Sequence, residues 1–140
     1  MNISDIEIRF VTNWPEDEIV SLYHAGGWWK DEYEPSGIRY LIEGSFCFAV
    51  VIDKMSGRTI GMGRVLSDGV SDGYIQDLVI LPEYRKQGIG KILTRSLIDY
   101  CTSKGVTWIA LISEPDQDEF YKKLGFKEMK GYVPLKYEED

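Results

Sequence analysis

The chain has 140 residues, 44% of them hydrophobic and 28% charged, which fits one soluble globular domain. Its 16 basic and 23 acidic residues leave a net charge of −7, whereas a general nucleic-acid binder needs a basic surface for phosphates. No apolar run reaches the roughly 18 residues of a membrane span, and the N-terminus lacks the pattern of a signal peptide. We therefore expect a cytoplasmic protein without nucleic-acid or membrane partners.

The first half of the chain predicts a strand, two helices and a hairpin. Apolar residues alternate over residues 6–11, which indicates a strand. Pro15 and the acids after it favour a helix that ends at two glycines, and residues 35–45 predict a second short helix. Residues 46–53 and 58–68 are predicted as the paired strands of the hairpin.

The second half alternates strands and helices. Residues 74–82 predict a buried strand, and apolar positions at three- and four-residue steps predict a helix over residues 88–104. A strand over residues 106–113, a short helix over 114–126 and a last strand over 132–137 are expected to follow. This order of elements predicts a single domain over residues 1–140 with a layered α/β or α+β fold.

Metal-ligand patterns are absent from the sequence. Cys47 and Cys101 stand far apart, which is more typical of buried thiols than of a bridge or a metal site. His24 is the only histidine, so the His/Cys spacing of a zinc site is lacking and we expect no metal.

The stretch "LPEYRKQGIGKIL", residues 81–93, places two glycines between a strand and a helix. Backbone N–H groups at a helix N-terminus favour an anion, and glycine lets that anion approach closely. The stretch does not match a P-loop, because Ile92 stands where serine or threonine is required. It does not match a dinucleotide fingerprint either, because Leu93 replaces the third glycine.

What remains is R-x-x-G-x-G over residues 85–90, followed by Tyr121 shortly before Gly125 and Phe126. In these two motifs the sequence resembles the GNAT superfamily of N-acetyltransferases. The resemblance implies a mixed, mostly antiparallel twisted sheet flanked by helices, with two central strands that splay apart. It also implies acetyl-CoA as cosubstrate. The residues expected to bind it are Leu78, Val79 and Ile80 for the pantetheine arm, and Arg85, Lys86, Gln87, Gly88, Ile89, Gly90 and Lys91 for the pyrophosphate.

The resemblance assigns Tyr121 as the general acid that protonates the leaving thiolate. The base that takes a proton from the amine is less clear, and Asp77 on the central strand is our first candidate. Asp68 and Asp72 lie in the preceding loop, where Asp-Gly pairs are typical of turns, and His24 lies far away in the sequence. Residues 113–121 lack the asparagine and alanine that many members carry there, so we transfer no asparagine contact.

The acceptor is predicted from residues 25–35, where Trp28, Trp29 and Tyr33 stand among carboxylates. Aromatic faces and carboxylates suit a cation, although tryptophans that cap the core below a solvated charge run are the more ordinary reading. We expect acetyl transfer to the primary amine of a small molecule, such as a polyamine, an arylalkylamine or an amino acid. A protein lysine or N-terminal amine, and a non-catalytic acyl-CoA sensor, remain alternatives, and the oligomeric state is left open with a homodimer as one option.

Overall fold

The computed structural model describes residues 3–139, which divide into two compact units between Ala110 and Leu111. The elements of the first unit are η1 (Ile3–Asp5), β1 (Ile6–Phe10), α1 (Glu16–Ala25), α2 (Gly37–Glu43), β2 (Cys47–Asp53), β3 (Thr59–Ser67), β4 (Asp72–Ile80), η2 (Pro82–Tyr84), α3 (Ile89–Ser103) and β5 (Trp108–Ala110). The second unit contains α4 (Asp118–Lys122).

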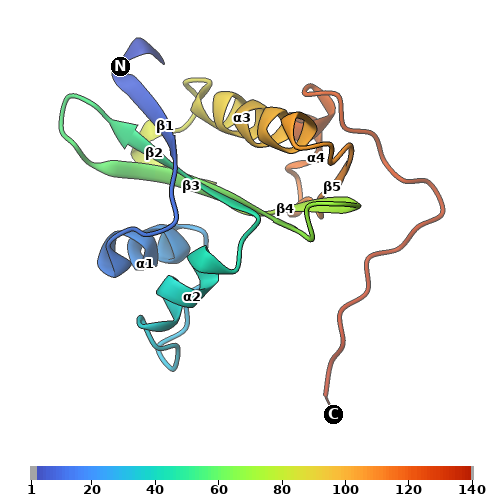
Figure 1. Ribbon diagram of the computed structural model, residues 1–140, viewed down its shortest axis with the longest axis horizontal. Coiled ribbons are helices and arrows are strands. Elements are labelled where there is room, and N and C mark those ends of the chain that lie inside the picture. Colours follow the sequence, from blue (N-terminus) through green and yellow to red (C-terminus); the bar gives the residue numbers. More distant parts are fainter. Residues whose placement is uncertain (1–2, 140) are drawn as a thin grey trace. The chain divides into compact units, whose positions relative to one another are not determined.

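The first unit is a five-stranded sheet in the order β1-β2-β3-β4-β5. The first four strands are antiparallel neighbours, and β5 lies parallel to β4. Helices α1 and α2 cover one face of this sheet and α3 covers the other (Figure 1). The predicted α+β class, with a mixed and mostly antiparallel sheet between helices, is confirmed.

The core of the first unit lies on both faces of the sheet. All seven residues of β2 are buried, which explains why this strand reads as an unbroken apolar run rather than an alternating one. Helix α3 turns a stripe of buried residues toward the sheet: Ile89, Leu93, Leu97 and Cys101. On the other face, Ile19 and Leu22 of α1 are fully buried. Cys47 and Cys101 are free and buried, as predicted.

Strand β4 is interrupted by a β-bulge that the sequence did not predict. Met62 pairs with Val79 and Arg64 pairs with Gln76, so Gly63 faces both Asp77 and Leu78. Asp77 takes the left-handed conformation, with φ of 58°. A bulge of this kind adds one residue to a strand and shifts the register on either side of it by one.

Two predicted strands differ from the structure. The strand expected over residues 106–113 is limited to Trp108–Ala110, because its parallel pairing with β4 ends at Tyr74. The strand expected over residues 132–137 is wrong, since no strand is assigned there. Pro134 in this segment has no N–H to donate to a ladder, which disfavours pairing despite the apolar pattern.

Candidate active site

The stretch between β4 and α3 forms a turn rich in unpaired backbone donors. Gly88 caps α3 with φ of 85°, a left-handed conformation that glycine adopts without strain. Among residues 3–139, no backbone carbonyl accepts from the N–H groups of residues 86–91. These donors lie at the positive end of the α3 dipole, so the turn is suited to bind an anion.

Two side-chain contacts hold the segment that leads into the turn. Arg85 donates from Nε to the carbonyl of Ile80 at 2.8 Å, which ties the turn to the end of β4. Just before it, the Tyr84 hydroxyl donates to Asp53 Oδ2 at 2.8 Å. This hydrogen bond holds the pKa of the Asp53 carboxyl below its ordinary value. Gln87 Oε1 is buried without a hydrogen-bond partner among the described residues.

The edge of β4 that leads into this turn is open. β5 pairs with β4 only as far as Tyr74, so within residues 3–110 the β5 side of residues 75–80 has no strand partner. The Leu81 N–H donates to the Ile60 carbonyl of β3, so the backbone of Leu81 faces β3. Because strand residues direct their backbone groups alternately to the two edges, Leu78 and Ile80 direct theirs to the open edge. This is the splay expected between the central strands.

The bulge directs Asp77 and Leu78 to opposite faces of the sheet. A Cβ placed on Gly63 would lie 3.0 Å from Leu97 and 3.7 Å from Leu78, so the Leu78 side chain is on the α3 face. Asp77 points instead toward α1, where its Oδ2 accepts from the Tyr23 hydroxyl at 2.7 Å. Arg64 Nε donates to the same oxygen at 2.7 Å.

Sequence reasoning singled out neither Tyr23 nor Arg64. Tyr23 lies four residues after Ile19 on the buried stripe of α1, which is the spacing of an ordinary core residue. Burial and the negative charge of Asp77 raise the pKa of the Tyr23 hydroxyl well above its ordinary value, so it remains a donor. A lone arginine within an apolar strand was the only available signal for Arg64.

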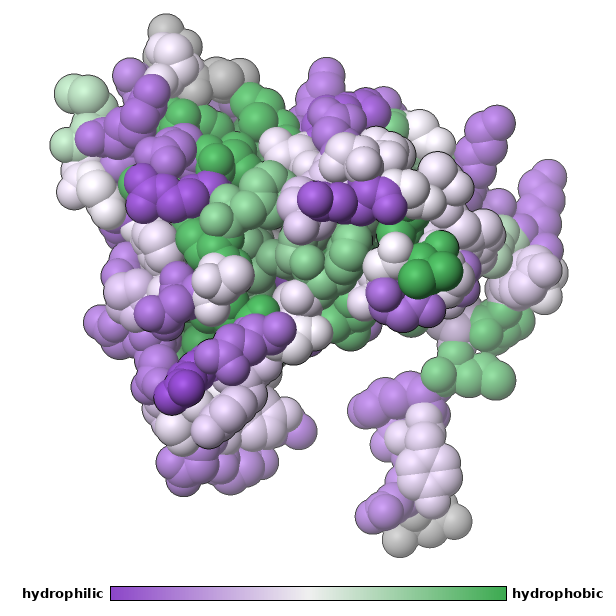
Figure 2. Space-filling model, viewed as in Figure 1, coloured by the Kyte–Doolittle hydropathy of each residue, from purple (hydrophilic) through white to green (hydrophobic). Residues whose placement is uncertain are grey.

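The three aromatic residues predicted for the acceptor pocket lie in and next to the connection between α1 and α2. The rings of Trp29 and Tyr33 are 5.4 Å apart, and Tyr23 lies 6.1 Å from Trp28 and 6.3 Å from Trp29. These four residues are called the aromatic cluster below. This part of the molecule is coloured mainly white to purple in Figure 2, as expected for aromatic and charged residues.

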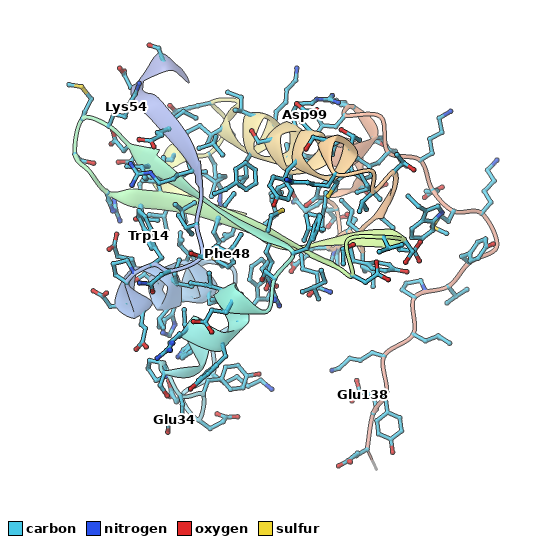
Figure 3. The ribbon with its side chains drawn as sticks, viewed as in Figure 1. Trp14, Glu34, Phe48, Lys54, Asp99 and Glu138 are labelled. Carbon is cyan, nitrogen blue, oxygen red and sulfur yellow. The ribbon has the colours of Figure 1, made fainter. Side chains whose placement is uncertain are left out.

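The carboxylates near this cluster are exposed. Asp31, Glu32 and Glu34 all face solvent, and Glu34 lies at the end of the connection away from the sheet (Figure 3). His24 is exposed too, with its ring 6.3 Å from that of Trp29.

Asp68 in the loop before β4 is part of a local turn. Its Oδ1 accepts from the N–H groups of Val70 and Ser71 at 2.7 and 2.8 Å. The hydrogen bonds from these amides lower the pKa of the Asp68 carboxyl, the Ser71 amide having the largest effect. The turn-forming interpretation of Asp68 is confirmed, whereas Asp72 opens β4.

Tyr121 belongs to the second unit, where it lies on α4. Its ring meets those of Phe120 and Phe126 at 5.0 and 5.9 Å, both nearly edge to face. Its carbonyl accepts from Leu124 and Phe126 in the turn that follows. Burial, together with the charge of Glu114, raises the pKa of the Tyr121 hydroxyl, so it stays protonated at neutral pH.

Among residues 3–139, no group of three or more His, Cys, Asp or Glu side chains is arranged to hold a metal ion. Over the same residues, no helix has the length and apolar character needed to cross a membrane.

Comparisons with known proteins identify the family to which this fold, with its open strand edge and the turn before α3, belongs. A model of the acetyltransferase (GNAT) family matches residues 8–126, which include parts of both units. The GNAT family protein SP0256 from Streptococcus pneumoniae TIGR4 superposes with a TM-score of 0.75 at 24% identity, covering 95% of this chain and 99% of that one.

Two relatives extend the comparison. An uncharacterized N-acetyltransferase, ycf52, from Porphyra purpurea is 29% identical over 128 residues, 90% of this chain and 72% of that protein. Serotonin N-acetyltransferase 2, chloroplastic, from Oryza sativa subsp. japonica is 35% identical over 71 residues, 51% of this chain and 36% of that protein. The chain thus spans only part of the length of these relatives. It belongs to the acetyltransferase (GNAT) family and is an acyltransferase.

Proposed function

We propose that the protein transfers the acetyl group of acetyl-CoA directly to the primary amine of a small molecule. The observation that carries this proposal is the adjacency of the open β4 edge and the unpaired N–H groups of residues 86–91. CoA has a linear arm with amide groups followed by a pyrophosphate, and the edge and the turn offer matching partners in that order.

The pantetheine arm is proposed to bind along Leu78, Val79 and Ile80. Its amides would continue the hydrogen bonding of the sheet, as an added strand does. The pyrophosphate would accept hydrogen bonds from the N–H groups of the turn that follows β4, where Lys86 and Lys91 add positive charge. Arg85 already donates from Nε to the Ile80 carbonyl, so we assign it chiefly to holding the turn against the strand.

The chemistry requires two proton transfers. An alkyl amine has a pKa of about 10.4, so only about one molecule in 2,500 is neutral at pH 7 and able to attack the thioester. A base must therefore remove that proton. Asp77 stays the predicted base, and because Oδ2 already accepts two hydrogen bonds, Oδ1 is the atom that would take the proton.

The second proton goes to the sulfur. When the amine attacks the carbonyl carbon, a C–N bond forms, the C–S bond breaks and the thiolate leaves. Tyr121 is proposed to protonate this thiolate, and its raised pKa keeps the hydroxyl in the form that can donate at neutral pH.

The aromatic cluster supports an amine with cationic or aromatic character as acceptor. Ring faces attract cations, and the four rings, linked through Tyr23 and Trp29, offer an apolar surface beside the negative charge of Asp77. The rice relative is named for serotonin, an arylalkylamine, which is one member of this class. Acetylation of a protein lysine or N-terminus is the second candidate. The cytoplasmic location expected from the sequence also stays a prediction.

The direct test is release of free thiol from acetyl-CoA with a panel of amines: polyamines, arylalkylamines, amino acids and a lysine peptide. Burial raises the pKa of the Cys47 thiol to about 12, and Cys101 is fully buried, so the protein itself should contribute little signal. We expect turnover with at least one small amine. Turnover with the peptide alone would favour the second candidate, and tight CoA binding without any turnover would favour a sensor.

A further inference from the structure

Asp77, Arg64 and Tyr23 form a nearly buried polar cluster from three elements. The side chains of Arg64 and Asp77 are only 15% and 21% exposed, and Tyr23 as a residue is 6% exposed. Arg64 and Tyr23 donate to the same carboxylate oxygen, each at 2.7 Å. Charge-assisted hydrogen bonds this short and shielded are among the stronger polar contacts in proteins.

The cluster holds a residue that is in an unfavourable backbone conformation. Asp77 is one of three non-glycine residues with positive φ among residues 3–139. Such a conformation costs energy and persists where the surroundings fix it, although aspartate and asparagine tolerate it better than most residues. Here Arg64 of β3 and Tyr23 of α1 fix the Asp77 side chain through hydrogen bonds.

The bulge at Asp77 determines which backbone groups reach the open edge. Before the bulge Arg64 pairs with Gln76, and after it Met62 pairs with Val79, which is a shift of one residue. Without that shift, the alternation of the strand would reverse, and the backbone groups of Leu78 and Ile80 would face β3 instead of the open edge. The conformation of one residue thus fixes the orientation of the proposed pantetheine-binding segment.

We propose that Tyr23 and Arg64 are positioning residues that hold the bulge at Asp77 and thereby direct Leu78 and Ile80 toward acetyl-CoA. That Leu78 and Ile80 are directed toward acetyl-CoA rests on the proposed function, whereas the role of Tyr23 and Arg64 in holding the bulge does not. Tyr23 also contacts Trp28 and Trp29, so one side chain joins the aromatic cluster to the bulge. On the far side, Arg64 lies 3.5 Å from Ser45 Oγ, which in turn donates to the carbonyl of Leu41 in α2.

The variants at Asp77 separate positioning from base catalysis. Asp77→Asn keeps a side-chain oxygen for both donors and tolerates positive φ, but it cannot act as a base. Asp77→Ala loses the acceptor and is strained, whereas Asp77→Gly loses the acceptor without strain. We expect the dissociation constant for CoA to stay within about threefold of wild type for Asn and to rise about tenfold or more for Ala and Gly. All three variants should lose turnover, because none keeps the proposed base.

Tyr23→Phe removes a single hydroxyl from the cluster, and Tyr40→Phe on α2, where Tyr40 is 67% exposed, is its matched control. We expect a fall in kcat/KM of about tenfold for Tyr23→Phe and none for Tyr40→Phe. Amide exchange measured without CoA tests the structural link alone. The amides of Val79 and Leu81, which face β3, should exchange faster in the Ala, Gly and Tyr23→Phe variants and at the wild-type rate in the Asn variant.

The outcomes are distinct. CoA affinity and amide exchange at the wild-type level in the Ala and Gly variants, with only turnover lost, would leave Asp77 as the base alone and overturn the positioning role. Unchanged exchange and activity in Tyr23→Phe would likewise overturn it. If the exchange differences appear but wild-type protein neither binds CoA nor releases thiol, the link holds and the proposed function fails.

Discussion

The cofactor side and the acceptor side of the proposed site are built in different ways. The cofactor side, residues 78–91, offers mainly backbone groups: the open edge of β4 and the unpaired N–H groups before α3. The acceptor side, by contrast, consists of side chains from α1, the α1–α2 connection and β3. The comparison shows that the cofactor side depends on backbone conformation, whereas the acceptor side depends on residue identity.

This difference leads to opposite expectations for mutations. A change that alters backbone access near Gly88 and Gly90 should affect CoA and leave amine selectivity alone. A change at Trp28, Trp29 or Tyr33 should affect the amine and leave CoA binding alone.

Tyr121→Phe should lower kcat by about 100-fold while the dissociation constant for CoA stays unchanged. The substitution removes a proton donor and leaves the turn of residues 86–91 intact. Steady-state kinetics together with calorimetric CoA binding would measure both quantities. Tyr132→Phe, at a residue that is 75% exposed in the same unit, is the control. Full activity of Tyr121→Phe would remove this residue from the mechanism.

Gly90→Val should weaken CoA binding about 10- to 100-fold, because a branched side chain would crowd the pyrophosphate and cost one or more hydrogen bonds to it. Gly37→Val is a matched control, since Gly37 also lies in the first turn of a helix and an added Cβ there meets no atom within 4 Å. Calorimetry with CoA is the measurement. Equal affinity in both variants would contradict the placement of the pyrophosphate.

Trp29→Ala should raise KM for the amine about tenfold and leave KM for acetyl-CoA unchanged, because the lost ring contacts only the acceptor side. Trp108→Ala, at a half-exposed tryptophan on β5, serves as control for loss of an indole. An unchanged amine KM in Trp29→Ala, with turnover intact, would assign the aromatic cluster to core packing alone.

Tyr84→Phe should have the smallest effect, a lower melting temperature with CoA affinity reduced only about threefold, since Arg85 still holds the turn. The pKa of Asp53 is lowered in the folded state, so this hydrogen bond stabilises the protein above the ordinary carboxyl pKa. That stability is lost as pH falls through the lowered value. Melting curves of both proteins should therefore differ at pH 7 and converge below about pH 4. A constant difference would contradict this role.

The sequence predicted most of the cofactor side because backbone sites require particular residues. A left-handed N-cap at position 88 and close approach of a phosphate both call for glycine, and glycines at fixed spacing are visible in the sequence. Strand and helix periodicity likewise predicted the elements of the first unit. It failed at residues 132–137, where apolar alternation suggested a strand that finds no partner.

The acceptor side was predicted only in part because it depends on contacts between distant residues. Tyr23, Arg64 and Asp77 are separated by 41 and 13 positions, and each fits an ordinary local pattern. The bulge that brings them together has no glycine at its left-handed position, so the usual sequence signal was missing. Only the register of β3 against β4 reveals it.

We propose that backbone N–H groups of one continuous segment bind CoA, and amide hydrogen exchange with and without CoA measures the protection of these groups. With CoA bound, exchange should slow at residues 86–91 and at Leu78 and Ile80 on the open edge of β4, and it should change little in the α1–α2 connection. Binding of CoA with no added protection in either segment would contradict this proposal.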